Sequence, residues 1–352
     1  MISTNSCPNC APAPPRLTSD PAHDASHMAH ALRLARRGLG NVWPNPAVGC
    51  VLVRDGRVVG RGWTQPGGRP HAERMALDHA GDLARGATAY VTLEPCAHHG
   101  RTPPCAEGLV ASGVTRVVTA LTDPDPRVAG KGHAMLRAAG IALTQGVLAD
   151  RAAELQAGFL SRITRRRPFV TLKLASSLDG RIAMASGESR WITGPDARAH
   201  VHALRAQHDA VMVGGMTARA DLPQLNVRGI HTPQQPVRIV VSSQALPPLA
   251  PQDADHGPLW RVDGAPEQIM ADLAGRGITR VFCEGGGRLA ASLLAAGLVD
   301  QVIGYSAGLM LGSDARPFVG PTGWERLAEA PRFRLVETRP IGPDLFHRWR
   351  VL

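Results

Sequence analysis

The chain has 352 residues, 44% of them hydrophobic and 19% charged, which predicts two globular domains and excludes a protein that is disordered throughout. No apolar run is long enough to span a bilayer, and the first thirty residues lack an apolar signal-peptide core, so we expect a cytoplasmic protein with no membrane partner. The net charge of +10 indicates anionic partners, and the 4% content of aromatic residues argues against a stacking surface for nucleic acid.

Residues 1–25 are predicted to form a disordered tail. The tail holds Cys7 and Cys10, whose C-x-x-C spacing occurs in zinc and redox sites, but no predicted strand or helix surrounds them, so a chance occurrence is favoured. The chain has six cysteines in all. Because no secretion signal is present, we expect reduced thiols, and metal binding or catalysis is favoured over disulfides.

The first half of the chain alternates between predicted helices and strands after a β-hairpin whose turn is Asp55-Gly56. Hydrophobic periodicity predicts helices at 27–37, 71–80, 105–112, 131–139 and 150–165, and strands at 48–53, 58–63, 87–93, 116–121 and 141–145. Such alternation is typical of an α/β domain whose sheet is largely parallel beyond the hairpin. We place this domain at residues 26–166, because an arginine-rich helix end before Pro168 is a natural boundary.

The second half, residues 167–352, shows a second alternation and predicts another α/β domain. Strands are predicted at 169–174, 210–213, 238–241, 280–283 and 302–305, a closing antiparallel pair at 333–337 and 345–351, and helices at 195–206, 266–273 and 288–295. A proline-rich loop is predicted at 246–258.

The first half contains a set of residues that suits a catalytic zinc site. His71, Cys96 and Cys105 supply one imidazole and two thiolates, which leave the fourth position of a tetrahedral site open for water. Glu73, two residues from the histidine, is placed to move the proton of that water. Each residue alone is better explained by a structural role, but the combination resembles the H-x-E and P-C-x-x-C signature of zinc deaminases, with eight residues between the cysteines instead of two.

A glycine-rich segment in the second half, Gly285 to Ala290, lies between a predicted strand and a predicted helix. Glycines allow the backbone to approach a pyrophosphate, and the helix N-terminus offers N–H groups. The acidic residue expected about twenty positions later is missing, so a Rossmann fold is not supported and a plain tight turn is the alternative. Lys173, one of only two lysines, lies at the end of a predicted buried strand in the same half.

Two polar residues of the first half are candidates for substrate binding. Asn45 lies in a rigid Pro-Asn-Pro loop, and its amide could pair with the edge of a pyrimidinone, although a turn asparagine is the alternative. Lys131 begins a predicted helix and could meet a substrate phosphate, although a solvated lysine is the alternative.

Three segments of the chain carry a resemblance to a known family: Thr92 to Cys105, Asn45 to Gly49 and Asp123 to Gly132. They closely resemble segments of the bifunctional deaminase/reductases of riboflavin biosynthesis, and the resemblance runs from about residue 27 to the C-terminus. It implies an N-terminal cytidine-deaminase-like zinc domain followed by a C-terminal dihydrofolate-reductase-like α/β domain.

For the first half, the resemblance implies that His71, Cys96 and Cys105 bind one Zn²⁺ per chain, that Glu73 is the proton shuttle, and that Asn45 binds substrate. For the second half it implies NADPH as the cofactor. The residues that it implies for NADPH are Ala175, Trp191, Thr217, Asp221, Ser243, Gly286, Gly287, Arg288, Leu289, Ala290, Ala291 and Ser292. Those for the substrate are Ser189, Arg205, Leu225, Arg228 and Glu284, to which we add Lys173.

Arg205 and Arg228 suit binding of a phosphate, although solvated arginines are the alternative in a chain so rich in arginine. The second half departs from the family at three positions. Leu222 and Ser242 stand where the family often has Asp, which could alter the affinity for the cofactor, and Gly308 stands where the family has Pro.

The expected function is therefore bifunctional. The first half would hydrolyse an exocyclic amine from 2,5-diamino-6-(5-phosphoribosylamino)pyrimidin-4(3H)-one, and the second would reduce the ribosyl side chain of the product to ribityl phosphate. We expect phosphorylated pyrimidine substrates, no nucleic acid, and a homo-oligomer. The alternatives are a nucleic-acid deaminase, which leaves the second half unexplained, and a structural-zinc protein, which needs His98 or His99 as a fourth ligand.

Overall fold

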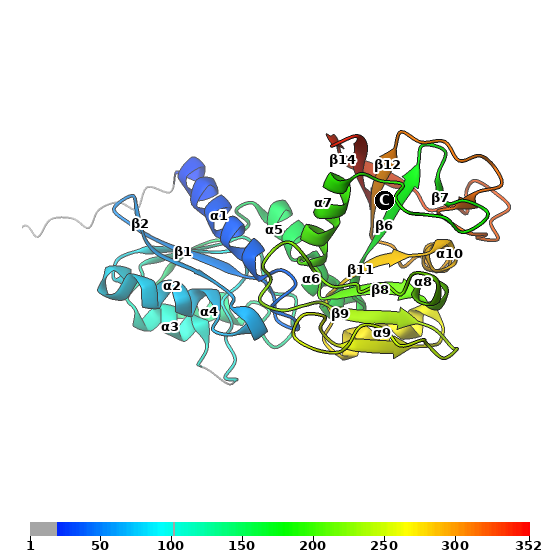
Figure 1. The fold of residues 1–352 in the computed structure, drawn as a ribbon. Helices are drawn as coiled ribbons and strands as arrows, with labels where there is room; N and C mark the ends of the chain where they lie inside the picture. The colour runs from blue at the N-terminus through cyan, green and yellow to red at the C-terminus, as the bar shows by residue number, and fades with distance from the viewer. Residues whose placement is uncertain (1–19, 101–102) are drawn as a thin grey trace, which may run out of the picture.

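The computed structural model describes residues 20–100 and 103–352, so Cys7 and Cys10 lie outside the described residues. Figure 1 shows two α/β halves side by side along the chain, the first in blue to cyan and the second in green to red. No helix of the described residues combines the length and the apolar character needed to cross a membrane.

The first helix, α1 (Pro21–Ala35), begins six residues earlier than we predicted, so residues 21–25 are helical and do not belong to a tail. Asp20 caps this helix by accepting the N–H of Ala22 at 2.9 Å, and Pro21 fits the first helical turn, where its missing N–H costs nothing. Asp24, inside the supposed tail, forms a buried ion pair with Arg116 at 2.6 Å.

The first half contains a five-stranded sheet in the order β2-β1-β3-β4-β5. The β1/β2 and β1/β3 pairs are antiparallel, while β3/β4 and β4/β5 are parallel, as the alternation predicts. The strands are β1 (Gly49–Arg54), β2 (Arg57–Trp63), β3 (Thr88–Val91), β4 (Arg116–Thr119) and β5 (Ala142–Thr144). The helices that follow α1 are α2 (Ala72–Ala80), α3 (Cys105–Ala111), α4 (Lys131–Ala138), α5 (Ala149–Leu155) and α6 (Ala157–Arg165).

This sheet is covered on both faces, because successive residues of a strand point to opposite sides. Cys50 and Leu52 of β1 pack in one core cluster with α2, α3 and α4, and Val51 and Val53 pack in another with α1 and α5. The helix predicted at 150–165 is in fact two helices separated at Gln156, whose amide hydrogen-bonds Ala47 O at 2.7 Å instead of facing solvent.

The second half contains an eight-stranded sheet in the order β10-β9-β8-β11-β6-β12-β15-β14. The six strands from β10 to β12 are mutually parallel, and β15 and β14 add the antiparallel pair that the sequence predicts. The strands are β6 (Phe169–Ser177), β8 (Ala210–Gly214), β9 (Val237–Val241), β10 (Leu259–Val262), β11 (Arg280–Gly285), β12 (Gln301–Ala307), β14 (Phe333–Ile341) and β15 (Asp344–Val351). The helices are α7 (Pro195–Arg205), α8 (Gly215–Asp221), α9 (Pro266–Gly275) and α10 (Gly287–Ala295).

Four short elements of the second half were not predicted: β10, α8, and the pair β7 (Arg181–Ala183) and β13 (Arg316–Pro317), which forms a separate two-stranded sheet. Each is too short to show a hydrophobic period of its own. Lys173 lies in the middle of β6, which continues to Ser177 instead of ending after Leu174.

Candidate functional site

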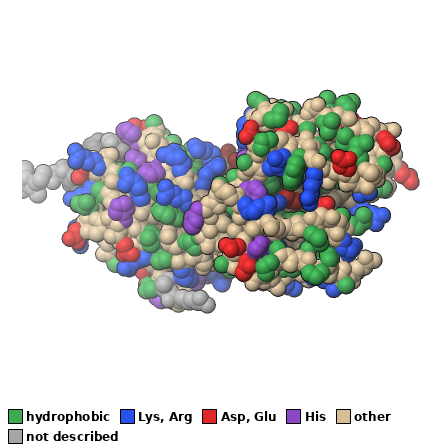
Figure 2. All heavy atoms as spheres, viewed as in Figure 1, with side chains coloured by type: hydrophobic (Ala, Val, Ile, Leu, Met, Phe, Trp, Pro, Cys, Tyr) green, Lys and Arg blue, Asp and Glu red, His purple; other side chains and the backbone are tan. Residues whose placement is uncertain are grey.

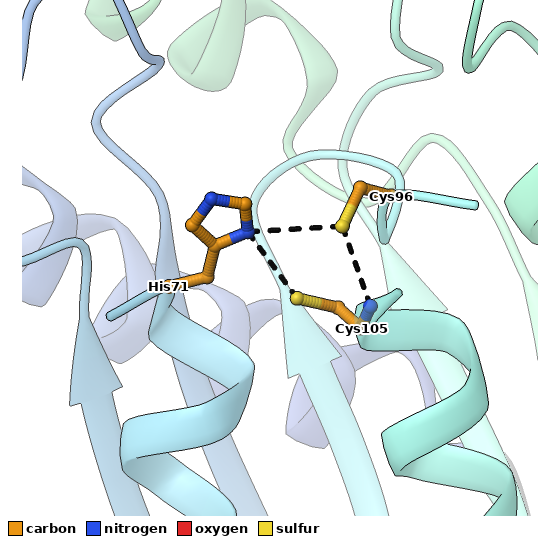
Figure 3. A group of neighbouring side chains, drawn as sticks. All are labelled: His71, Cys96 and Cys105. Carbon is orange, nitrogen blue, oxygen red and sulfur yellow. Dashed lines mark hydrogen bonds between the residues drawn. The ribbon is translucent and has the colours of Figure 1, made fainter. Parts of the chain in front are cut away.

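Three metal-ligating side chains of the first half, His71, Cys96 and Cys105, point toward one another (Figure 3) and are called the His-Cys-Cys cluster below. His71 is the N-cap residue of α2, Cys105 is the first residue of α3, and Cys96 lies in the loop after β3. Nδ1 of His71 lies 3.7 Å from Cys96 Sγ and 3.3 Å from Cys105 Sγ. All three ligand atoms lie within 4.8 Å of one another, a spacing that one bound metal ion can bridge.

Glu73 lies in the first turn of α2 beside this cluster, and its side chain is buried. Burial raises the pKa of Glu73 to about 7, and the charge of Cys96 acts in the same direction. The Cys105 thiol lowers the pKa of Cys96 to about 4, and the Cys105 backbone N–H, which donates to Cys96 Sγ at 3.3 Å, adds to this effect. A carboxyl group that titrates near neutrality suits a residue that must accept and then release a proton.

The cluster has three protein ligands within the ranges that the structure describes. A structural zinc site would need His98 or His99 as a fourth ligand, and neither histidine belongs to the cluster. His99 Nε2 lies 3.5 Å from the carboxylate of Glu107, and His98 is not part of the metal-ligating group. Three ligands leave one tetrahedral position open, which is the arrangement of a catalytic site.

Glu94 is a buried carboxylate that the sequence analysis missed. It accepts the backbone N–H groups of Asp123 at 3.2 Å, Gly130 at 3.0 Å and His133 at 3.2 Å. These bonds join the loop before α4 and the first turn of that helix to the segment that leads into Cys96. Its partners lie 29 to 39 residues away along the chain, so no local pattern could reveal its role.

The structure places the other two candidates of the first half differently. Asn45 is half-buried and donates from Nδ2 to Gly68 O at 2.8 Å, three residues before His71. Lys131 is exposed at the first position of α4. Asn45 is thus bonded to the segment that carries a residue of the cluster, whereas Lys131 lies on the surface.

The second half has a cleft of about 500 Å³ at the carboxyl ends of its parallel strands. In open α/β sheets, ligands bind outside this edge of the sheet. Figure 2 shows the right-hand half hollowed, with basic side chains along the hollow. The cleft brings together most of the candidates that the sequence analysis singled out in this half. Those that line it are Lys173, Ala175, Ser189, Trp191, Arg205, Thr217, Asp221, Leu225, Arg228, Glu284, Gly286 and Ala290.

Six of the residues that we expected at the cofactor do not line this cleft: Ser243, Gly287, Arg288, Leu289, Ala291 and Ser292. The last five belong to α10, in which Ala291 is buried in the helix packing. Ser243 follows β9, and its carbonyl accepts Arg261 Nη2 at 2.7 Å. Tyr305 and Phe318 line the cleft and were not predicted, because the first lies on a strand and the second in a loop with no motif.

The two arginines that we expected to bind phosphate have different partners. Arg205 forms a bidentate ion pair with Glu284, at 2.5 Å from Nε and 3.0 Å from Nη2, and donates from Nη1 to Asn226 O at 2.7 Å. Arg228 donates to the neutral oxygens of Gln224 and Asn226, at 2.8 and 2.6 Å. The charge of Arg205 is therefore balanced within the protein, whereas Arg228 offers a net positive charge to the cleft.

Glu284 is ionised through this contact. Burial is the largest single effect and acts to raise its pKa, but the charge and hydrogen bonds of Arg205, together with the charges of Lys173 and His202, outweigh burial and lower it. Lys173 faces the same carboxylate, and burial lowers the pKa of this amine.

The three departures from the family lie at different places. Leu222 lines the cleft with 54% of its surface exposed. Ser242 is buried at the end of β9, where its hydroxyl lies 3.3 Å from Arg219 Nη1 and its carbonyl accepts Arg261 Nε at 3.0 Å. Gly308 has open space around it, so this position requires no particular side chain.

Comparison with known proteins agrees with this division of the chain. The family model of the cytidine and deoxycytidylate deaminase zinc-binding region matches residues 21–121, and that of the RibD C-terminal domain matches residues 168–347. The riboflavin biosynthesis protein RibD of Escherichia coli is 45% identical, over 92% of this chain and 98% of its own length. That of Haemophilus influenzae is 44% identical, over 92% and 96%.

Solved structures give the same result over both halves. A structure of Acinetobacter baumannii RibD superposes with a TM-score of 0.86 at 41% identity and covers 95% of this chain and all of its own. A diaminohydroxyphosphoribosylaminopyrimidine deaminase/5-amino-6-(5-phosphoribosylamino)uracil reductase from Thermotoga maritima superposes with a TM-score of 0.83 at 34% identity, over 94% of this chain and 99% of its own.

The fold and the two sites define an enzyme that joins a zinc-type deaminase and a reductase in one chain. The chain belongs to the RibD family, the bifunctional deaminase/reductases of riboflavin biosynthesis. The hydrolase and oxidoreductase activities expected from the resemblance are therefore those of its family.

Proposed function

We propose that the first half deaminates 2,5-diamino-6-(5-phosphoribosylamino)pyrimidin-4(3H)-one and that the second half then reduces the ribosyl side chain of the product with NADPH. The observation that carries the proposal is the His-Cys-Cys cluster beside buried Glu73, in one chain with a cleft at the carboxyl ends of a parallel sheet. The Thermotoga maritima protein is named as a deaminase and a reductase of these two compounds, which supports the same assignment for this chain.

The first site fits one zinc ion per chain. Two thiolates and an imidazole are ligands that zinc prefers, and three of them leave a position open. When bound, zinc supplies the Lewis acidity that makes water a nucleophile near neutral pH. Glu73 would take one proton of the water as its oxygen bonds to the amine-bearing ring carbon, and would deliver that proton to the ring nitrogen. It would then move the proton of the new hydroxyl group to the amine, whose C–N bond breaks to release ammonia and leave a ring carbonyl.

The substrate of this half is held by residues around the cluster. Asn45 has its Nδ2 committed to Gly68 O, while its Oδ1 accepts no hydrogen bond within the described part of the chain. We propose that this oxygen pairs with a donor on the pyrimidinone edge. Lys131 is proposed to meet the phosphate from its exposed position at the start of α4.

The cleft of the second half has the volume of a ligand pocket, and its lining combines apolar side chains with Lys173, Arg205, Arg228 and Glu284. NADPH, when bound, supplies a hydride. We propose that Ala175, Trp191, Thr217, Asp221, Gly286 and Ala290 contact it in the cleft, and that it extends beyond the cleft toward the first turn of α10 and Ser243. The proposed substrate contacts are Lys173, Ser189, Arg205, Leu225, Arg228 and Glu284.

A preference for NADPH is supported by the surroundings of Ser242. Arg219 donates to the hydroxyl of Ser242, and Arg261 donates to the carbonyl oxygens of Ser242 and Ser243, just after β9. Neither arginine has a carboxylate partner among the described residues. An Asp at position 242 would pair with these arginines, whereas Ser leaves their charge available to a 2′-phosphate.

We also propose a domain boundary between residues 166 and 167, supported by the two large sheets, which share no strand. A cytoplasmic location is part of the proposal, because that compartment keeps the thiols of a zinc site reduced. The homo-oligomer remains a prediction.

The test measures the two reactions separately, deamination by ammonia release and reduction by NADPH oxidation. Purified protein is incubated with the diaminopyrimidine phosphate, with and without NADPH, while ammonia release and NADPH oxidation are recorded. Ammonia is expected in both mixtures, and NADPH oxidation only after ammonia appears. NADPH oxidation without ammonia would overturn the proposed order of the two reactions.

A further inference from the structure

The segment of residues 40–47, which contains Asn45, contacts both halves of the chain. On the side of the first half, Asn45 Nδ2 donates to Gly68 O at 2.8 Å and Asn41 O accepts the N–H of Gly67 at 2.8 Å. Gly67 and Gly68 immediately precede the stretch that ends at His71. The 40–47 segment is thus bonded to the chain that positions a residue of the His-Cys-Cys cluster.

On its other side, the same segment packs against the second half. Trp43 packs on the main hydrophobic core of the second half. Gly277 has a φ of +99°, and a Cβ on it would lie 3.1 Å from Pro44 Cβ and 3.5 Å from the Trp43 ring. A Cβ on Gly40 would overlap the carbonyl of Ala206. Glycines at both contacts therefore allow the two halves to approach closely.

A second chain of contacts reaches the end of the segment. Arg280, at the start of β11, donates from Nη2 to Leu155 O at 2.6 Å. The next residue, Gln156, is buried and donates from Nε2 to Ala47 O at 2.7 Å. Gln156 therefore holds Ala47 O, and Leu155, its neighbour in the chain, is bonded to Arg280 of the second half.

The space between these parts is filled. The void bounded by the 40–47 segment, by Gln156 and by Arg280 has a volume of about 10 Å³, about the smallest that holds one water molecule. Close-packed contacts of this kind transmit small displacements because they have little room to relax.

We propose that the second half holds Asn45 in place for deamination, through the 40–47 segment, so that the reductase half is a structural part of the deaminase pocket. This inference rests on the proposed binding of substrate by Asn45. Trp43 and Gln156 are positioning residues in this scheme, because they act through Asn45 and not on the substrate.

Deamination should depend on these contacts between the halves, whereas reduction should not. The contacts of the second half come from residues 206–209, from Thr232 and from residues 277–280, which lie before or at the starts of β8, β9 and β11. The reductase cleft lies at the opposite ends of these strands. Loss of the contacts should therefore affect deamination and leave reduction of a pre-deaminated substrate unchanged.

The test uses the full-length zinc-loaded chain and measures ammonia release, NADPH oxidation and zinc content. Trp43→Ala should raise the KM for deamination about tenfold or more, because small displacements of a positioning group are costly. Zinc content and the kinetics of reduction should stay those of the wild type, and Trp43→Phe should restore most of the loss. Trp349→Ala is the control, because Trp349 is a half-buried tryptophan of the same half that lies in β15, which pairs with β12 and β14 and not with β8 or β11.

Gln156→Met provides an independent variant that removes the hydrogen bond to Ala47 O and keeps the size of the side chain. It decides the matter if Trp43→Ala loses zinc or reductase activity through misfolding. If Asn45→Ala raises the KM while Trp43→Ala and Gln156→Met leave it unchanged, the inference is wrong and the proposed function stands. If Asn45→Ala leaves deamination unchanged, the proposed role of Asn45 fails and the inference fails with it.

Discussion

Replacement of Arg205 by alanine should destabilise the second half more than it weakens substrate binding. Arg205 and Glu284 form a bidentate ion pair whose side chains are only 11% and 9% exposed. Removing one partner of a buried pair costs about 3–5 kcal/mol when the remaining charge is left unpaired, and Lys173, the other cation that faces Glu284, places the expected cost toward the lower end. For a domain of this size the melting temperature should fall by roughly 6–20 °C.

The loss should depend on pH in a defined direction. In the wild type, Arg205 lowers the pKa of Glu284, so the pair contributes stability above the ordinary glutamate pKa and loses it as the pH falls. In Arg205→Ala the lowering effect of the arginine is lost, so burial raises the pKa of Glu284 above its value in the wild type. The carboxyl group then becomes neutral as the pH falls, and the difference in stability between variant and wild type should narrow toward acidic pH.

Urea unfolding at several pH values measures this difference, with Arg228→Ala as the control. Because Arg228 has only neutral partners, its loss should leave stability nearly unchanged. Instead it should raise the reductase KM for the phosphorylated substrate by about one to two orders of magnitude. A double variant, Arg205→Ala with Glu284→Gln, should be more stable than Arg205→Ala alone. If Arg205→Ala unfolds like the wild type and only the substrate KM rises, Arg205 faces the phosphate and the reasoning from the ion pair is wrong.

Four further predictions concern the zinc site, the cofactor and the first helix. Glu73→Gln should keep one zinc per chain while ammonia release falls by about 10² or more; loss of zinc with activity would assign Glu73 to the metal instead. Cys105→Ser should lose zinc and deamination but keep NADPH oxidation with a pre-deaminated substrate, and collapse of both would refute separate sites. The kcat/KM for NADPH should exceed that for NADH by at least about tenfold, or about 1.4 kcal/mol. Arg219→Ala should reduce this ratio, and an unchanged ratio would show that Arg219 does not bind the 2′-phosphate. Asp24→Asn should lower the free energy of unfolding by about 3–5 kcal/mol near pH 7. Burial acts to raise the pKa of Asp24, but Arg116 and Tyr90 together lower it. The loss of stability should therefore shrink as the pH falls below the usual aspartate range, where the carboxyl group of the wild type also becomes neutral. A loss that does not depend on pH would contradict the ion pair.

The sequence predicted best what depends on neighbours along the chain. The strands and helices of the alternation are present, with shifts of a few residues at their ends, because each carries its own hydrophobic period. The residues of the His-Cys-Cys cluster were found because they lie in a motif of fixed spacing, with two of them at helix starts.

What the sequence did not predict depends on partners that are distant in the chain. Glu94 is explained only by the N–H groups of the loop before α4, and the charge of Arg205 only by Glu284, 79 residues away. The start of α1 was placed too late because Asp24 is paired with Arg116, 92 residues away. A polar segment near the N-terminus has the composition of a tail, and no local signal shows that one of its carboxylates is buried.

The contacts that hold the 40–47 segment lie at one edge of the large sheet, and the reductase cleft lies at the other. If the second half holds Asn45 as proposed, this arrangement gives it one edge that supports its neighbour and another that carries its own cleft. The loops at the carboxyl ends of the strands, where Leu222 lines the cleft, therefore lie away from the surface that faces the first half. The fused chain can therefore adapt its second reaction while the first retains its supporting surface.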